Sequence, residues 1–235
     1  ASHVVDSNLT TPGPLELQAL FHRMVQHRIQ VCAMEVSSIA LDQQRINGSN
    51  FSVGVFTNFT QDHLDYHQSM ESYFESKLRF FRDYHLPAVV VNLDDKRSND
   101  ILRGAHSSRQ LTFSLNNPDA SFCVLESEFK KTGTWAKVKC PQGNFEIKTP
   151  LIGSHNLQNV LGVLAVVEAQ GLDFVKAIEE SGWTLSDVEM LSKSRNDCIS
   201  LPDGSYCFAP DKSPIDGFGL FCSADVPQGH LFAPM

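Results

Sequence analysis

The sequence TNFTQDHLDYHQSM, residues 57–70, places two His and two Asp in one short polar stretch that directly follows an apolar run. Imidazole and carboxylate groups bind metal ions and move protons, so this stretch is the first candidate for chemistry. His63 and His67 are four residues apart and would share one face of a helix. A zinc site would need further ligands, and no cysteine lies nearby. We interpret His67 as a hydrogen-bonded histidine at the solvent edge. For His63 both a surface role and a ligand role stay open.

A lysine on an apolar helix face is the second candidate. Lys77 has the helical spacing of the apolar residues Met70, Tyr73, Phe74, Leu78 and Phe81. A lysine in such a place extends its amine to solvent, pairs with a carboxylate, or has a lowered pKa. A neutral amine is a nucleophile that can take up carbon dioxide as a carbamate, which is an anion that binds metals. The sequence leaves these alternatives open.

Polar residues follow three apolar runs, residues 29–36, 51–56 and 88–91, which alternate with helical patterns. This alternation predicts a parallel α/β sheet, whose ligands bind beyond the carboxyl ends of the strands. Glu35 stands at the end of the first run, where it is either a surface residue or a ligand for Mg²⁺. Asn156 and Asn159 share one face of a later helix, where they either cap it or bind a ligand.

The sequence pattern of the remaining residues predicts two structural parts. Residues 110–151 contain short β-prone pieces separated by turns, which we interpret as antiparallel strands added to the sheet. A helix is expected over residues 156–170. Beyond Trp183 the pattern weakens, and only residues 219–223 and 229–233 suggest short strands. We therefore expect a mostly parallel α/β domain, flanked by helices, over residues 1–182, and a short irregular or β tail over residues 183–235.

Composition excludes several classes of protein. The chain has 235 residues and a net charge of -8, which opposes the basic face that a broad nucleic-acid interface needs. No apolar run is long enough for a membrane span, and no signal peptide opens the sequence. The six cysteines lie far apart and form no C-x-x-C pair, so the sequence indicates neither a zinc site nor a redox motif. The cytoplasm is the expected compartment.

Five stretches together resemble the central domain of the Mur ligases, in particular the UDP-N-acetylmuramoyl-tripeptide synthetase branch. They occur in the family's order within residues 5–180 and are LTTPGPLELQ, CAMEVSSIALDQQR, VFTNFTQDHLDYHQSMESYFESK, VVVNLDD and LIGSHNLQNVLGVLAV. The resemblance implies an ATP- and Mg²⁺-dependent amide ligase of peptidoglycan synthesis. In the family, ATP phosphorylates the carboxylate of UDP-MurNAc-L-Ala-D-Glu, and the amine of lysine or diaminopimelate attacks the acyl phosphate.

The resemblance also implies roles for single residues. Contacts to the UDP-MurNAc dipeptide are implied for Thr10, Thr11, Ser37, Gln43 and Arg45. Contacts on the nucleotide side are implied for Asn58, Asn156 and Asn159. Glu35 and His63 would serve Mg²⁺, and Lys77 would be a carbamylated lysine that holds a second Mg²⁺. Lys77 and His63 are therefore the expected catalytic residues.

The sequence departs from the family in ways that keep a second function open. No G-x-x-x-x-G-K-[ST] loop occurs in these residues, and we expect the chain to begin after it and to lack the family's C-terminal domain. A partner chain that supplies the missing domains is one expectation, and a non-catalytic module that binds muropeptide or nucleotide is the alternative. Residues 213–232 faintly resemble the first strands of a SET domain, where Gly217 and Gly219 would approach a ligand.

Overall fold

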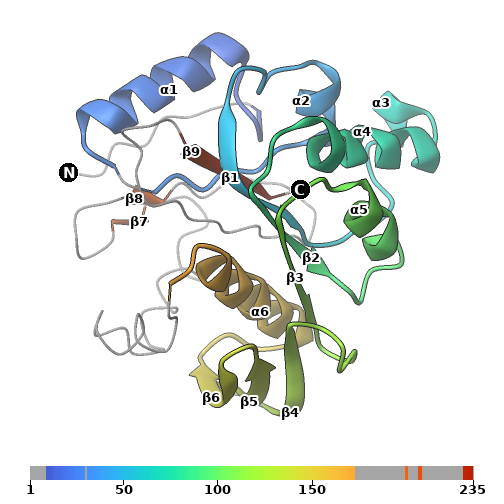
Figure 1. The fold of residues 1–235 in the computed structure, drawn as a ribbon, viewed down its shortest axis with the longest axis vertical. Helices are drawn as coiled ribbons and strands as arrows, with labels where there is room; N and C mark the ends of the chain where they lie inside the picture. The colour runs from blue at the N-terminus through green and yellow to red at the C-terminus, as the bar shows by residue number, and fades with distance from the viewer. Residues whose placement is uncertain (1–8, 30, 173–198, 201–205, 208–229, 235) are drawn as a thin grey trace.

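The computed structural model describes residues 9–29, 31–172, 199–200, 206–207 and 230–234. Its main feature is a seven-stranded sheet with the strand order β6-β5-β4-β3-β2-β1-β9 (Figure 1). The strands are β1 (Asn50–Phe56), β2 (Ala88–Asn92), β3 (Arg109–Ser114), β4 (Phe122–Lys130), β5 (Gly133–Cys140), β6 (Gly143–Thr149) and β9 (His230–Pro234). Two short strands, β7 (Ile199–Ser200) and β8 (Tyr206–Cys207), pair with each other.

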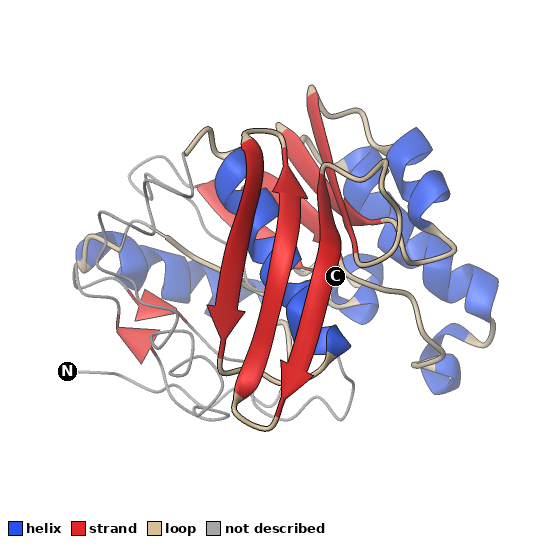
Figure 2. Cartoon of the chain, turned by 90° about the horizontal axis from the view of Figure 1, so that it is seen from below, coloured by secondary structure: helices blue, strands red, loops and turns tan. Residues whose placement is uncertain are grey.

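The sheet is parallel from β9 to β4 and antiparallel at its other end. Figure 2 shows the antiparallel strands β4, β5 and β6 side by side. The structure confirms the α/β class with a mostly parallel sheet. The β-prone piece at residues 111–115 pairs in parallel with β2, so the prediction that this piece is antiparallel was wrong. Its true partner is the preceding buried strand, and the antiparallel ribbon begins only with β4.

The described residues also form six helices, which are α1 (Pro14–Gln26), α2 (Ser38–Asp42), α3 (Leu64–His67), α4 (Met70–Asp83), α5 (Ser98–Gly104) and α6 (Ser154–Ala169). Helix α6 covers one face, where Leu157 and Leu161 pack with Val53 and Val55. Helices α4 and α5 cover the other face (Figure 1). None of these helices is both long and apolar enough to cross a membrane.

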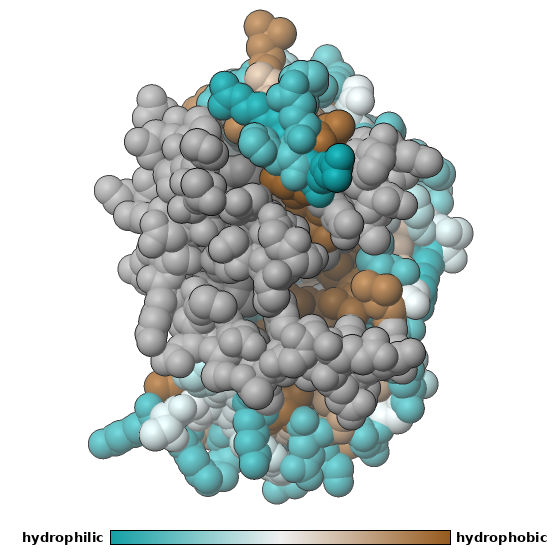
Figure 3. All heavy atoms as spheres, turned by 90° about the vertical axis from the view of Figure 1, so that its left-hand side faces the viewer, coloured by the Kyte–Doolittle hydropathy of each residue, from teal (hydrophilic) through white to brown (hydrophobic). Residues whose placement is uncertain are grey.

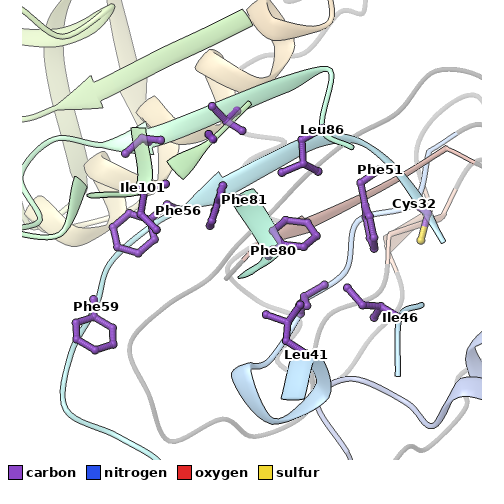
Figure 4. Packing of buried hydrophobic residues seen from close by; sticks show 14 of the residues in the cluster. Cys32, Leu41, Ile46, Phe51, Phe56, Phe59, Phe80, Phe81, Leu86 and Ile101 are labelled. Atoms are coloured by element: carbon purple, nitrogen blue, oxygen red, sulfur yellow. The ribbon is translucent and has the colours of Figure 1, made fainter. Parts of the chain in front are cut away.

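The core under α4 is aromatic. Phe80 and Phe81 pack with Phe51 and Phe56 of β1, with ring centroids 5.1 Å apart for Phe51 and Phe80 (Figure 4). Gly54 permits this approach, because a Cβ built there would lie only 2.9 Å from the Phe80 ring. The close contact fixes α4 against β1 and thereby fixes the position of Lys77.

The prediction of a strand at residues 29–36 was wrong. The described residues of this run form no strand, and only Ala33 makes an isolated bridge. The run is nevertheless buried at Cys32, Ala33 and Val36, so its apolar composition reflects burial and not strand pairing. The place beside β1 is taken by β9, which confirms the strand expected at residues 229–233. The expected domain boundary, the strand expected at residues 219–223 and the G-x-G of the tail all lie outside the described residues.

The single-turn helix α3 lies between two residues in the left-handed conformation, His63 with φ 53° and Gln68 with φ 64°. A side chain at positive φ strains the backbone, and glycine relieves this strain. We expect Gln68→Gly to raise the free energy of unfolding by about 0.5–1 kcal/mol in urea denaturation. The matched control is Gln18→Gly in the middle of α1, which should lower it by about 1 kcal/mol. Destabilisation by both substitutions would show that Gln68 is unstrained.

Candidate functional site

The carboxyl ends of β1 and β2 are tied together by side chains of β2 and the loop after it. Asn92 Nδ2 donates to the carbonyl oxygen of Thr57 at 2.6 Å, and the Phe59 amide donates to Asp95 Oδ2 at 2.6 Å. These bonds fix the start of the loop that carries Asn58, Asp62 and His63. The polar stretch of residues 57–70 therefore lies at the carboxyl edge of the sheet, where α/β sheets bind their ligands.

Asp94 joins the same edge to the opposite layer. Its carboxylate accepts hydrogen bonds from Ser114 Oγ at 2.5 Å, the Leu115 amide at 2.7 Å and Gln158 Nε2 at 2.9 Å. These donors follow β3 or begin α6, so one carboxylate holds the ends of β2 and β3 and the first turns of α6. Asn156 and Asn159 are thereby placed near this edge.

Lys77 is buried on the apolar face of α4, with 8% of its surface exposed, as its spacing predicted. Its Nζ lies 5.1 Å from the centre of the Tyr73 ring. None of the ion pairs among the described residues involves Lys77. Burial lowers the pKa of this amine to about 8, although the negative charges of Glu35, Asp62 and Asp95 oppose the shift. The charges of three carboxylates therefore act on the buried amine, which forms an ion pair with none of them.

Glu35 carries the charge opposite to that of Lys77 in this region. Burial raises the pKa of its carboxyl group, and the positive charge of Lys77 partly offsets this rise. The two groups therefore lie close enough to influence each other's protonation. The two side chains place a carboxylate and an amine, which form no ion pair with each other, in a region of low polarity where each charge is costly alone.

The two histidines of the polar stretch have different surroundings. His63 Nε2 lies 3.0 Å from Asp62 Oδ2, and both side chains are partly exposed. His67 is buried, with Nε2 2.9 Å from Ser38 Oγ and its ring stacked on Tyr73 at 5.3 Å. Burial lowers the pKa of His67. The prediction of a hydrogen bond for His67 is thus confirmed, whereas its place at the solvent edge was wrong because α4 packs over it.

Four of the five residues implied to bind the dipeptide form one cluster. Thr11 Oγ1 donates to the Glu35 carbonyl oxygen and accepts from the Ser37 amide, both at 2.9 Å. Arg45 donates to the Thr11 carbonyl oxygen at 2.9 Å and through Nε to Gln43 Oε1 at 2.9 Å. Thr11 is fully buried, so its hydroxyl forms hydrogen bonds within the protein.

The remaining predicted site residues form few side-chain hydrogen bonds within the described part of the chain. Thr10 is exposed beside Thr11. Asn156 Nδ2 donates to the Ile152 carbonyl oxygen at 2.8 Å, which is a bond at the start of α6. Asn58 and Asn159 are half-buried, and no hydrogen bond of their side chains occurs within the described part of the chain. Their amides are therefore available to a ligand.

The described residues contain no group of three His, Cys, Asp or Glu side chains placed to hold a metal ion. The predicted set has only two such ligands, Glu35 and His63, and Lys77 becomes a third only as a carbamate. The donor chemistry nevertheless suits Mg²⁺, which binds a few hard oxygens and keeps several waters. Asp62 Oδ2 adds a buried oxygen, which lies 3.0 Å from His63 Nε2.

Asp94, Gln158 and Tyr73 were missed as site residues by sequence reasoning. Asp94 lies in the polar segment that follows β2, which was noted only as a strand end. Gln158 lies between the two asparagines of α6, on a face that the i, i+3 spacing of these asparagines does not include. Tyr73 was assigned to the apolar face alone, although its ring contacts His63, His67 and Lys77.

Known proteins resemble this chain in sequence and in fold. The family model described as the Mur ligase middle domain matches residues 1–167. The UDP-N-acetylmuramoyl-L-alanyl-D-glutamate–2,6-diaminopimelate ligase of Synechococcus elongatus is 42% identical over 195 residues, which are 82% of this chain and 36% of that protein. The ligase of the same name from Ectopseudomonas mendocina is 38% identical over 165 residues, which are 70% of this chain and 34% of that protein.

A solved structure of a ligase of this name superimposes with a TM-score of 0.51 and 30% identity, over 64% of this chain and 29% of the other. The chain thus spans about a third of the length of the relatives it matches. The match covers α1 to α6 nearly completely and includes every predicted site residue. The chain belongs to the Mur ligase family and contains the middle domain of that family.

Proposed function

We propose that this chain is the middle part of an ATP- and Mg²⁺-dependent ligase that joins a third amino acid to UDP-MurNAc-L-Ala-D-Glu. The observation that carries the proposal is the buried Lys77, whose pKa is influenced by the charge of Glu35, together with the cluster of Thr11, Ser37 and Arg45, in which Thr11 donates to the Glu35 carbonyl oxygen. The names of the relatives favour diaminopimelate as the added amino acid.

Arg45, a cation without a described carboxylate partner, supports the proposed binding of the UDP-MurNAc dipeptide. Arg45 is half-buried, and it makes no ion pair with a described carboxylate. Its guanidinium is oriented by Thr11 and Gln43, so little side-chain entropy is lost when an anion binds. The UDP-MurNAc dipeptide carries phosphates and carboxylates, which are suitable partners for such a group.

The metal side depends on the state of Lys77. As an ammonium this side chain would repel Mg²⁺, whereas as a carbamate it would offer two oxygens. A pKa of about 8 leaves about one amine in ten neutral at pH 7, far more than for an ordinary lysine. We assign Glu35, His63 and carbamylated Lys77 as the groups that would hold Mg²⁺. The bound ion would offset charge on the transferred phosphoryl group.

The nucleotide side is assigned to Asn58, Asn156 and Asn159. The 235 residues contain no G-x-x-x-x-G-K-[ST] loop, so we place the cradle for the ATP phosphates on a further segment or on a partner chain. The same observation favours a second candidate function, a non-catalytic module that binds the muropeptide precursor. The two candidates share the dipeptide site and differ only in turnover.

Calorimetry with UDP-MurNAc-L-Ala-D-Glu tests the dipeptide site. We expect the chain to bind this compound and Arg45→Ala to weaken binding at least about tenfold, because an oriented cation is lost. The matched control is Arg79→Ala, which removes an exposed guanidinium 3.5 Å from Asp42 and should leave affinity unchanged. Equal affinity of the Arg45→Ala variant, or no binding by the parent at millimolar concentration, would contradict the proposed site.

A further inference from the structure

Figure 3 shows hydrophobic atoms exposed at the surface on one side of the molecule. Among the described residues, eight large hydrophobic side chains are exposed, and Tyr66 is the only one of them that carries a polar group. A single exposed hydrophobic side chain is common and needs no explanation. The Tyr66 hydroxyl, however, has hydrogen bonds to two other side chains, which gives this residue a defined polar environment.

Helix α3 holds Tyr66 in a fixed place beside α2 (Figure 1). The next residue, His67, is buried, and its Nε2 lies 2.9 Å from Ser38 Oγ of α2. The ring of Tyr66 packs against the ring of His67 in a T-shaped contact, with centroids 4.9 Å apart. The backbone and the ring of Tyr66 are therefore held on the protein side, and its hydroxyl has a defined position.

The Tyr66 hydroxyl lies between two side chains at the end of α2. It donates to Asp42 Oδ2 at 2.9 Å and accepts from Gln43 Nε2 at 3.4 Å. Because its only proton is directed to the carboxylate, the hydroxyl offers lone pairs alone to the Gln43 amide. Arg79 lies 3.5 Å from the other carboxylate oxygen of Asp42, Oδ1. The pair of Asp42 and Tyr66 thus selects the nitrogen end of the Gln43 amide.

The orientation of the Gln43 amide decides what this side chain presents to Arg45. Gln43 Oε1 accepts from Arg45 Nε at 2.9 Å and from Arg45 Nη2 at 2.5 Å. If the amide turned by 180°, its NH2 group would face the guanidinium, and both of these groups can only donate. Tyr66 disfavours this rotation because its hydroxyl is the acceptor for Nε2. It thereby keeps an acceptor oxygen against Arg45, in addition to the carbonyl oxygen of Thr11.

We propose that Tyr66 is a positioning residue of the dipeptide site, which fixes the Gln43 amide and through it directs the guanidinium of Arg45 toward an anionic group of the substrate. The inference rests on the proposed function, and it adds α3 to the elements that shape this site. Tyr66 acts through Arg45 and has no contact of its own with the substrate. Its effect on binding therefore depends on the presence of Arg45.

The proton on Arg45 Nε reports this orientation in the free chain. NMR measures the exchange of this proton with water, which is slowed while Nε donates to Gln43 Oε1. We expect Tyr66→Phe, which removes only the hydroxyl, to speed this exchange about threefold or more, because a neutral hydrogen bond is lost. The matched control is Tyr84→Phe, which removes a hydroxyl that donates to Asn47 Oδ1 at 2.6 Å and should leave the exchange unchanged. Equal exchange in the parent and Tyr66→Phe, or an equal increase in Tyr84→Phe, overturns the proposal.

Calorimetry with UDP-MurNAc-L-Ala-D-Glu distinguishes positioning from direct contact. We expect Tyr66→Phe to weaken binding about threefold or more in the parent and to have no further effect in the Arg45→Ala chain. A further loss in the Arg45→Ala chain would show that Tyr66 contacts the substrate itself, and full affinity of Tyr66→Phe would show that Arg45 needs no support. Either result overturns the positioning role. Absence of binding by the parent contradicts the proposed function, and the exchange measurement alone then decides whether Tyr66 orients Arg45.

Discussion

Replacing Lys77 with methionine is expected to leave the chain at least as stable at pH 7 as the parent. The buried ammonium costs stability, because burial lowers its pKa from 10.5 to about 8, a difference worth about 3 kcal/mol. Methionine keeps the apolar stem and removes the charge. The substitution also removes the cation that opposes the raised pKa of Glu35. We therefore expect the double variant Lys77→Met/Glu35→Gln to be more stable than either Lys77→Met or the parent.

The pH dependence of this difference has a definite sign. The unfolded chain keeps the lysine proton up to about pH 10.5, whereas the folded chain releases it near pH 8. The unfolded state therefore binds more protons between these values, and the parent gains stability as pH rises through this window. The advantage of the methionine variant should be constant below pH 8 and should shrink from pH 8 to 10.5. Urea denaturation of both proteins across this range measures the difference.

The opposite result would change the account of α4. A loss of about 3 kcal/mol or more at pH 7 in Lys77→Met would show that the lysine is a paired structural cation. A difference that does not change between pH 8 and 10.5 would show that its pKa is not lowered. Lys96→Met is a suitable control, because this lysine lies outside the apolar face of α4 and is exposed.

Asp94→Ala is expected to lower the free energy of unfolding by about 2–3 kcal/mol. The carboxylate accepts three hydrogen bonds, from Ser114, Leu115 and Gln158, and a hydrogen bond to a charged group contributes about 1.5–3 kcal/mol. The net loss is smaller than the sum, since Asp94 is exposed and water replaces part of the bonding there. The largest local effect should be faster amide exchange at Leu115 and in the first turn of α6.

The control for this experiment lies in the same region of the chain. Asp119 is exposed, and its carboxylate accepts no hydrogen bond from the described residues, so Asp119→Ala should change stability by less than about 0.5 kcal/mol. Asp94→Asn should have an intermediate effect, because the amide keeps one acceptor oxygen. Equal stability of the Asp94→Ala and Asp119→Ala proteins would mean that Asp94 does not hold the sheet edge together.

Local patterns predicted the elements that carry the site. The helical spacing of Tyr73, Phe74, Lys77 and Phe81 predicted both α4 and the place of the lysine on its apolar face. The apolar runs at residues 51–56 and 88–91 predicted β1 and β2, because buried parallel strands have continuous apolar sequences. These features depend on neighbours within a few turns, which a sequence displays directly.

Features that depend on distant partners were missed. The run at residues 29–36 has the composition of a buried strand, but composition reports burial and cannot distinguish a ladder from an extended buried segment. The pairing of β9 with β1 joins residues about 180 positions apart, and no local pattern contains it. The burial of His67 depends on Tyr73 of the next helix, and the role of Asp94 depends on α6.

One measurement tests the central claim most directly. Residues 9–172 of this chain replace the matching residues of the Synechococcus elongatus ligase, to which the chain is 42% identical over 195 residues. Formation of the amide between UDP-MurNAc-L-Ala-D-Glu and diaminopimelate is then followed with ATP and Mg²⁺. We expect the chimera to ligate and Lys77→Met to reduce the rate at least about a thousandfold, as expected when a group that stabilises the transition state is lost. A chimera that folds and binds the dipeptide but does not ligate, or one that is unaffected by Lys77→Met, would contradict the account.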